Sequence, residues 1–257
     1  MLVGCDPEFY VLKTGTKTIV QLESLVEGII GDDEDEMDGM WAETFGWDHG
    51  GCVAEIRPKP ADTTIRLIEN IQSALVHTWL GKQLWDVSKY TWRAGAWLSN
   101  VDNDDIRRSI GGHVHLDAVP LAREQEVRQR LDYLFDSLVG FGWFPQRETA
   151  SRTRYGEVVD TVRWTNRTPE VGRMEYRRFP SWLYSKELTT VVLGFSKAAV
   201  TKPKSWDRFL TGGAEPGKFL NMARTVWGET SVAAKALLRR DVLDHPDLTR
   251  PLQEVWA

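Results

Sequence analysis

The heptapeptide GGHVHLD at residues 111–117 constrains the fold most, because it is typical of a short strand with two histidines on one face. Alternate side chains of an extended strand share a face, so His113 and His115 point the same way while Val114 and Leu116 point into a core. The whole sequence has only 5 histidines. The pair is either a polar outer face of an amphipathic strand or part of a metal or phosphate site, which would need carboxylates from other strands.

Three further strand-like segments, GCDPEFYVL, AEIRP and RMEYR, carry charged residues at alternating positions. Each segment therefore directs a charged pair to one side of a strand. Together with the histidines, four strands offer charged groups to what could be a single sheet face. The pairs are Asp6 with Glu8, Glu55 with Arg57, and Glu175 with Arg177.

A divalent cation is the expected partner of such a face. Burying several like charges without a cation would cost several kcal/mol per ion. Donor sets rich in oxygen with a single imidazole favour Mg²⁺ or Mn²⁺. Zinc is disfavoured, because the sequence has neither a closely spaced cysteine pair nor an H-E-x-x-H motif.

Composition places the chain among ordinary globular proteins. Its residues are 42% hydrophobic and 27% charged, which is typical of a globular protein. A length of 257 residues is enough for one large domain or two small ones. A net charge of −5 excludes nucleic-acid binding through bulk positive charge. With no basic N-terminal segment followed by an apolar run, and no apolar stretch of about 18 residues, we expect no membrane association and a cytoplasmic location.

The two cysteines, Cys5 and Cys52, are too few for a disulfide framework. Neither lies in a recognised pairing motif with a histidine, which a catalytic thiol would need. We therefore expect both to be free thiols that act as small buried hydrophobic residues.

The order of elements predicts an α+β fold with an antiparallel or mixed sheet. Strands are expected in 2–12, 50–58, 89–98, 111–117 and 171–182. Helices are expected over 62–80 with Asp62 as N-cap and with Ile65 on its apolar face, over 121–141, and from 181 to about 200. The acidic run GDDEDEMDG at 31–39 is either a solvated connection or a loop that closes over a cationic ligand or metal. No linker or internal repeat is evident, so a single domain over 1–257 is predicted, with a mainly helical part from 183.

The motifs together resemble those of a known enzyme family. GCDPEFYVL is similar to the G-x-E-x-E-F-F strand of glutamine synthetases, GGHVHLD to their glycine-rich H-x-H strand, and GRMEYRRFP to their R-x-E-x-R segment, in the same order along the chain. A closer similarity is to the phage-encoded carboxyl–amine ligase family, type 2, of the glutamine synthetase and glutamate–cysteine ligase superfamily. That family shares D-P-E-F, x-E-I-R-P, G-G-H-x-H and E-Y-R. The similarity covers about residues 2–182 and implies a mostly antiparallel curved sheet with helices on its outer face.

The resemblance also implies a set of site residues. It assigns catalytic roles to Glu55, to His115 as a contact of phosphate or substrate, and to Arg177 as the arginine that faces the transferring phosphoryl group. The residues that it implies as metal ligands are Asp6, Glu8, Glu55, His113 and Glu175.

Four arginines are the expected nucleotide-binding residues. Arg152 and Arg154, in SRTRYG, resemble basic residues that hold nucleotide phosphate or substrate carboxylate. Arg57 and Arg177 complete the set, and structural ion pairs with neighbouring acids are the alternative role for these two. Asp48 and His49 lie near the position of another acid of the family, but at a different spacing from Glu55.

The implied activity is an ATP- and Mg²⁺-dependent (or Mn²⁺-dependent) ligase that forms an amide from a carboxylate and an amine through an acyl phosphate. Its partners would be small-molecule or peptide substrates, in the host cytoplasm if the protein is phage-encoded. One alternative is a phosphotransferase acting on a carboxyl or guanidino group, since the same residues would serve it. A non-catalytic phage scaffold or virion protein is another. A metal-dependent amidohydrolase is disfavoured by the arginines and by the absence of a typical zinc set.

Overall fold

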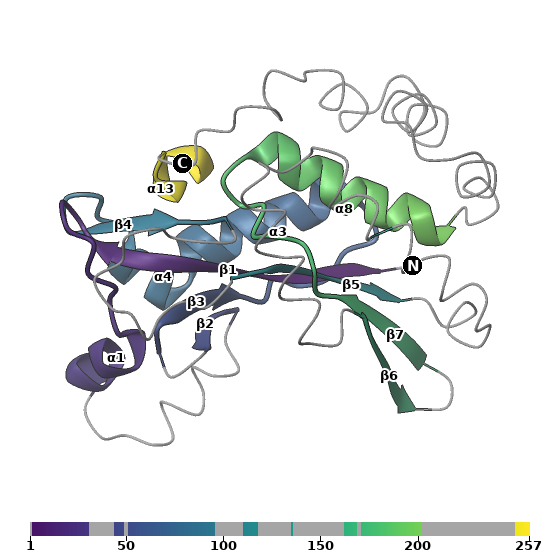
Figure 1. The fold of residues 1–257 in the computed structure, drawn as a ribbon, viewed down its shortest axis with the longest axis horizontal. Coiled ribbons are helices and arrows are strands. Elements are labelled where there is room, and N and C mark those ends of the chain that lie inside the picture. The colour runs from purple at the N-terminus through teal and green to yellow at the C-terminus, as the bar shows by residue number, and fades with distance from the viewer. Residues whose placement is uncertain are drawn as a thin grey trace.

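The structure, a computed structural model, describes residues 2–30, 44–48, 51–95, 110–117, 135, 162–168, 171–201 and 250–257. Its centre is a seven-stranded sheet (Figure 1) with the order β2-β3-β1-β5-β7-β6, in which β4 also pairs with β1. Every strand pair is antiparallel. The strands are β1 (Val3–Lys13), β2 (Phe45–Asp48), β3 (Val53–Ile56), β4 (Tyr90–Arg93), β5 (Gly112–Asp117), β6 (Val162–Thr168) and β7 (Val171–Tyr176).

Strand β1 organises the sheet, because it pairs with β3, β4 and β5. Its alternate residues Val3, Cys5 and Phe9 are buried in the main hydrophobic core. Asp6 and Glu8 fall on the opposite face, as the period-two pattern predicts. The predicted α+β class with a mostly antiparallel sheet is therefore confirmed.

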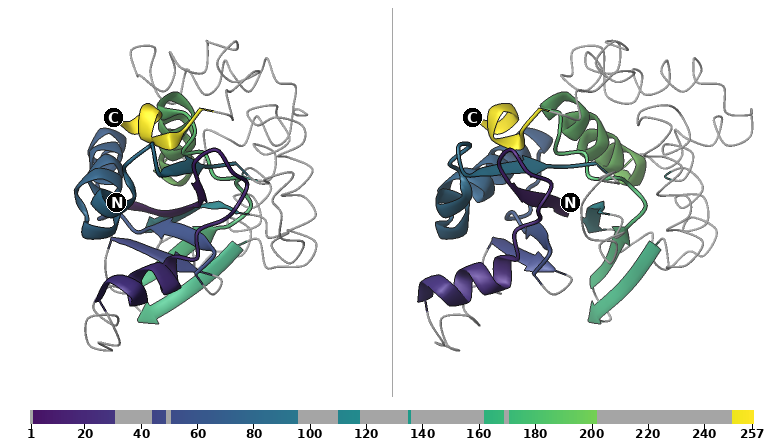
Figure 2. Two further views of the ribbon diagram at one scale, coloured as in Figure 1. Left: turned by 90° about the vertical axis from the view of Figure 1, so that its left-hand side faces the viewer. Right: turned by 60° about the vertical axis from the view of Figure 1, so that its left-hand side comes forward.

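Helices α3 (Thr64–His77) and α8 (Lys186–Thr201) lie over the apolar face of this sheet, whereas α1 (Leu22–Ile30) lies apart from them (Figures 1 and 2). Helix α3 contacts β1, β3 and α8, and α8 also contacts β5. The side chains that α3 buries are Leu67, Ile71, Ala74 and Leu75. The helices are α1 (Leu22–Ile30), α3 (Thr64–His77), α4 (Trp79–Leu84), α8 (Lys186–Thr201) and α13 (Leu252–Trp256).

The start of α3 corrects one detail of the sequence prediction. The N-cap is Thr63 and not Asp62, because Thr63 has extended dihedral angles and its hydroxyl accepts a hydrogen bond from the Arg66 amide at 3.2 Å. Ile65 was expected on the apolar face but is 64% exposed. The helix also ends earlier than predicted, at a second cap formed by Thr78, which begins α4.

Two strands were not predicted from the sequence, namely β2 and β6. The predicted helix over 121–141 lies outside the described residues except for Phe135, which is buried against Tyr176 with ring centroids 4.9 Å apart. The acidic run 31–39 also lies outside them. No helix in the described part of the chain is long and apolar enough to cross a membrane.

Candidate active site

The register of four strands brings the predicted charged residues to one region of the sheet. Asp6 lies directly opposite His113, and Glu8 lies opposite Glu55. On the far side of β5, His115 lies opposite Glu175. Because residues directly opposite each other in an antiparallel pair share a face, the cluster that the alternation predicted is formed.

Asp6 contacts both histidines, one with each carboxylate oxygen. Its Oδ1 lies 3.2 Å from His113 Nδ1, and its Oδ2 lies 3.2 Å from His115 Nε2. Burial raises the pKa of this carboxyl, but the hydrogen-bonding contacts and positive charge of the two histidines outweigh burial and hold the pKa well below its usual range. Asp6 is therefore a carboxylate at any physiological pH.

Glu175 joins the same centre from β7. Its Oε1 lies 3.9 Å from His113 Nδ1 and 3.4 Å from Arg177 Nε. Donor atoms of Asp6, His115 and Glu175 lie within 4.8 Å of one another, close enough to hold one metal ion. Two carboxylates with one imidazole fit Mg²⁺ or Mn²⁺. The imidazole in this set is that of His115, whereas the resemblance implied His113 as the ligand.

Glu55 and Arg57 form the other end of the cluster, on β3 and just after it. Arg57 Nε lies 2.6 Å from Glu55 Oε1. Burial raises the pKa of Glu55 to about 8, with the negative charges of Asp6 and Glu8 adding to the rise and Arg57 opposing it. Without a bound cation, Glu55 therefore carries a proton at neutral pH.

Glu8 is the most deeply buried acid of the group, with 4% of its surface exposed. Its Oε2 accepts a hydrogen bond of 2.6 Å from the backbone N–H of Gly111. One of its two oxygens is therefore engaged with the backbone just before the histidine strand.

The cysteines lie outside this cluster and are free thiols, as predicted. Cys5 belongs to the core on the other face of β1, and burial, together with the charge of Asp6, raises the pKa of its thiol. Cys52 is half-buried and donates to Gln21 Oε1 at 3.2 Å. A raised pKa keeps the Cys5 thiol protonated and unreactive.

Some predicted residues are not placed at the site. Arg152, Arg154 and His49 lie outside the described residues, and so does the side chain of Asp48. One position was missed by the sequence reasoning: Arg163 of β6 lies opposite Glu175 in the strand register. The alternation of charged and polar residues in VRWTNRT is the signal that could have found it.

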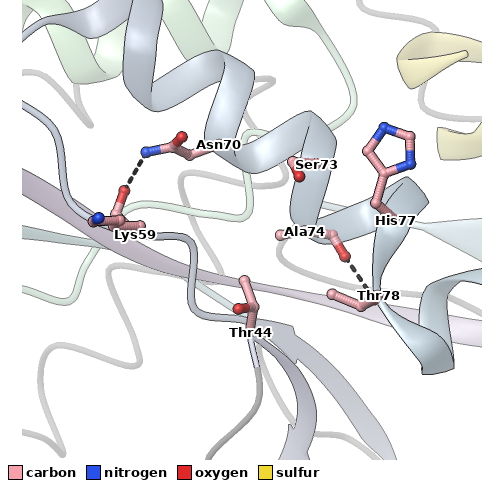
Figure 3. Close-up of a pocket in the computed structure, with 7 residues that line it drawn as sticks. All are labelled: Thr44, Lys59, Asn70, Ser73, Ala74, His77 and Thr78. Atoms are coloured by element: carbon pink, nitrogen blue, oxygen red, sulfur yellow. Dashed lines mark hydrogen bonds between the residues drawn. The ribbon is translucent and has the colours of Figure 1, made fainter.

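A separate pocket lies along α3, on the helical side of the sheet (Figure 3). It has a volume of about 240 Å³ and shares no residue with the carboxylate cluster. The Asn70 side chain lies at the edge of the pocket, where its Nδ2 donates a hydrogen bond to the Lys59 carbonyl at 2.6 Å. The residues that line it are Thr44, Lys59, Asn70, Ser73, Ala74, His77 and Thr78.

A comparison with protein families gives the class to which the chain belongs, a family of carboxyl–amine ligases. Residues 3–212 match the family described as Phage phiEco32-like COOH.NH2 ligase-type 2. The chain belongs to this family. The match extends beyond residue 182, where the recognised motifs end.

One solved structure with a similar fold is a crystal structure of a bifunctional glutathione synthetase from Pasteurella multocida, with a TM-score of 0.55 and 8% sequence identity. The match covers 99% of this chain and 49% of that chain, so this chain spans about half the length of that enzyme. No curated protein sequence matches the chain. Neither match supports the finer resemblance to glutamine synthetases or the placement in their superfamily, which stay predictions.

Proposed function

We propose that the protein activates a carboxylate with ATP and passes the acyl group to an amine, with Mg²⁺ or Mn²⁺ in the site. The observation that carries this proposal is the triad of Asp6, His115 and Glu175, whose donor atoms lie within 4.8 Å of one another. Arginines at both ends of the cluster, Arg57 and Arg177, supply the positive charge that phosphate and carboxylate groups need.

The chemistry proceeds in two displacements. A carboxylate oxygen of the first substrate attacks the γ-phosphorus of ATP, the bond to the bridging oxygen breaks, and ADP leaves. The amine nitrogen of the second substrate then attacks the carbonyl carbon of the acyl phosphate, and inorganic phosphate leaves as the amide forms. The nitrogen loses a proton in this step. The protein's contribution is therefore positioning and charge stabilisation.

Each group at the site has a proposed part in this scheme. Asp6, His115 and Glu175 hold the cation, which when bound neutralises charge on the phosphate oxygens. His113 orients the Asp6 carboxylate through its 3.2 Å contact. Arg177 stabilises charge on the transferred phosphoryl group. Glu55, which would lose its own proton when the cation binds, accepts the proton of the amine.

The remaining predictions also belong to this proposal. We infer that Arg57 binds the nucleotide or the carboxylate substrate, and that Arg152 and Arg154 hold nucleotide phosphate or substrate carboxylate. We further propose a glutamine synthetase-like sheet, a single catalytic domain, and action in the cytoplasm of the host cell if the protein is phage-encoded. The order of the acid, histidine and arginine motifs supports the sheet assignment.

The test is a screen of amino acids and short peptides for ADP release, with mass spectrometry of the products. We expect ADP to form together with a product whose mass is that of the two substrates minus water. The D6N variant is the matched control, because it removes one cation ligand at nearly constant volume, and it should release no ADP. A stable phosphorylated substrate would indicate a phosphotransferase instead. An absence of ATP binding in the presence of Mg²⁺ would support the non-catalytic alternative.

A further inference from the structure

The glycine pair before the histidines has all four of its backbone polar groups hydrogen-bonded. Gly111 donates to Glu8 Oε2 at 2.6 Å and accepts from the Glu8 amide at 2.9 Å. Gly112 donates to the Phe179 carbonyl at 2.9 Å and accepts from Trp182 Nε1 at 3.0 Å. Buried backbone groups must find such partners, so these bonds determine where β5 begins.

The bond from Gly111 to Glu8 departs from the usual antiparallel pattern. A hydrogen-bonded pair normally exchanges two backbone bonds. Here the Glu8 N–H donates to the Gly111 carbonyl, but the return bond from the Gly111 N–H goes to the Glu8 carboxylate. The side chain of Glu8 therefore completes the ladder between β1 and β5 at this end.

The partners on the other side of the glycine pair are equally specific. A Cβ atom at Gly112 would lie 2.4 Å from Trp182 Nε1, so only glycine allows this indole to reach the carbonyl. Trp182 is fully buried. The histidine strand is thus fixed at its start between Glu8 and Trp182.

We propose that Glu8 is a positioning residue, whose carboxylate fixes β5 through Gly111 and so presents His113 and His115 to Asp6. The resemblance implied a metal ligand at this position instead. The bond from Gly111 to Glu8 controls the register of β5 against β1. A slip of one residue would turn both histidines to the core face. The proposal rests on the proposed function only in taking Asp6, His115 and Glu175 as the cation site.

Two substitutions at Glu8 separate positioning from ligation. E8Q keeps an oxygen that can accept the Gly111 bond but removes the negative charge that a metal ligand supplies. E8A removes both. The D6N variant is the control for loss of a ligand.

The readouts are the Mn²⁺ affinity of the metal-free protein, measured by calorimetry, and hydrogen exchange of the Gly111 amide, measured by NMR. We expect E8Q to keep Mn²⁺ affinity within about threefold and to keep Gly111 protected. E8A should speed Gly111 exchange by roughly tenfold or more, because its buried N–H loses an acceptor.

The proposal is overturned if E8Q weakens Mn²⁺ binding as much as D6N does, or if E8A leaves Gly111 exchange unchanged. Should E8A fail to fold, the comparison of E8Q with D6N still decides. If the proposed function is wrong, the wild-type protein will bind no Mn²⁺. Exchange of the Gly111 amide in the Glu8 variants would still test whether the Glu8 carboxylate fixes β5.

Discussion

The carboxyl of Glu55 should make the metal-free protein less stable as the pH rises. Its pKa is about 8 in the folded chain, against 4.5 for a solvated glutamate side chain, the value taken for the unfolded chain. Between these values the folded state holds a proton that the unfolded state has released, so the free energy of unfolding falls as pH rises. The slope is about 1.4 kcal/mol per pH unit, and the whole loss is roughly 4 to 5 kcal/mol.

The assay is urea unfolding in EDTA at several pH values from 5 to 8.5, for wild type and E55Q. The glutamine is neutral at every pH, so the difference between the two proteins isolates the contribution of this carboxyl from all other titrating groups. Most of the loss should appear by pH 8. Above this pH the carboxyl ionises in both states, and the difference levels off.

Added Mg²⁺ should reduce the pH dependence, because a cation beside Asp6 offsets one of the charges that raise the pKa of Glu55. A parallel pH profile for wild type and E55Q in EDTA would refute the reasoning. It would mean that Glu55 is already ionised at neutral pH, with Arg57 and water compensating its burial.

Three further outcomes are expected. R177A should lower kcat by roughly a hundredfold or more, about 3 kcal/mol, with little change in Tm. R177K should recover only part of this kcat, because the point charge of lysine cannot replace the planar guanidinium group. An unfolded R177A protein would make Arg177 a structural partner of Glu175. The double variant C5A/C52A should keep its turnover, and a folded but inactive double variant would contradict the structural role given to both thiols. G112A should lower the free energy of unfolding by roughly 1 to 3 kcal/mol in urea titrations, because its Cβ would lie 2.4 Å from Trp182 Nε1; unchanged stability would show that the indole moves aside readily.

The sequence was sufficient to predict which charged residues share a face, because alternation along a strand is a local property of the backbone. It placed Asp6 with Glu8, and His113 with His115, correctly. It did not predict which strand lies beside which, since pairings such as His115 with Glu175 join segments about sixty residues apart in the chain. The grouping of Asp6, His115 and Glu175 within 4.8 Å of one another depends on this pairing.

The errors at α3 have a different origin. Asp62 and Thr63 are both good N-cap residues, so composition alone does not distinguish them. The extended dihedral angles at Thr63 decide the cap, and these depend on where the preceding chain leaves the sheet. Ala61 forms an isolated bridge with Val3 at that point, which fixes the approach to the helix.

The net charge of the carboxylate cluster indicates which kind of ligand it would bind. Ionised, the acids of the cluster carry four negative charges against two on the guanidinium groups. One divalent cation would balance this difference. Without the cation, a proton on Glu55 reduces the net negative charge, because the pKa of this carboxyl is raised to about 8. Proton and cation are thus alternative ways of neutralising one sheet face, so cation binding near neutral pH should release a proton. A nucleotide that enters this site would have to bring further positive charge with it, because the two guanidinium groups are already counted in this balance. The acids of the cluster are Asp6, Glu8, Glu55 and Glu175, and the arginines are Arg57 and Arg177.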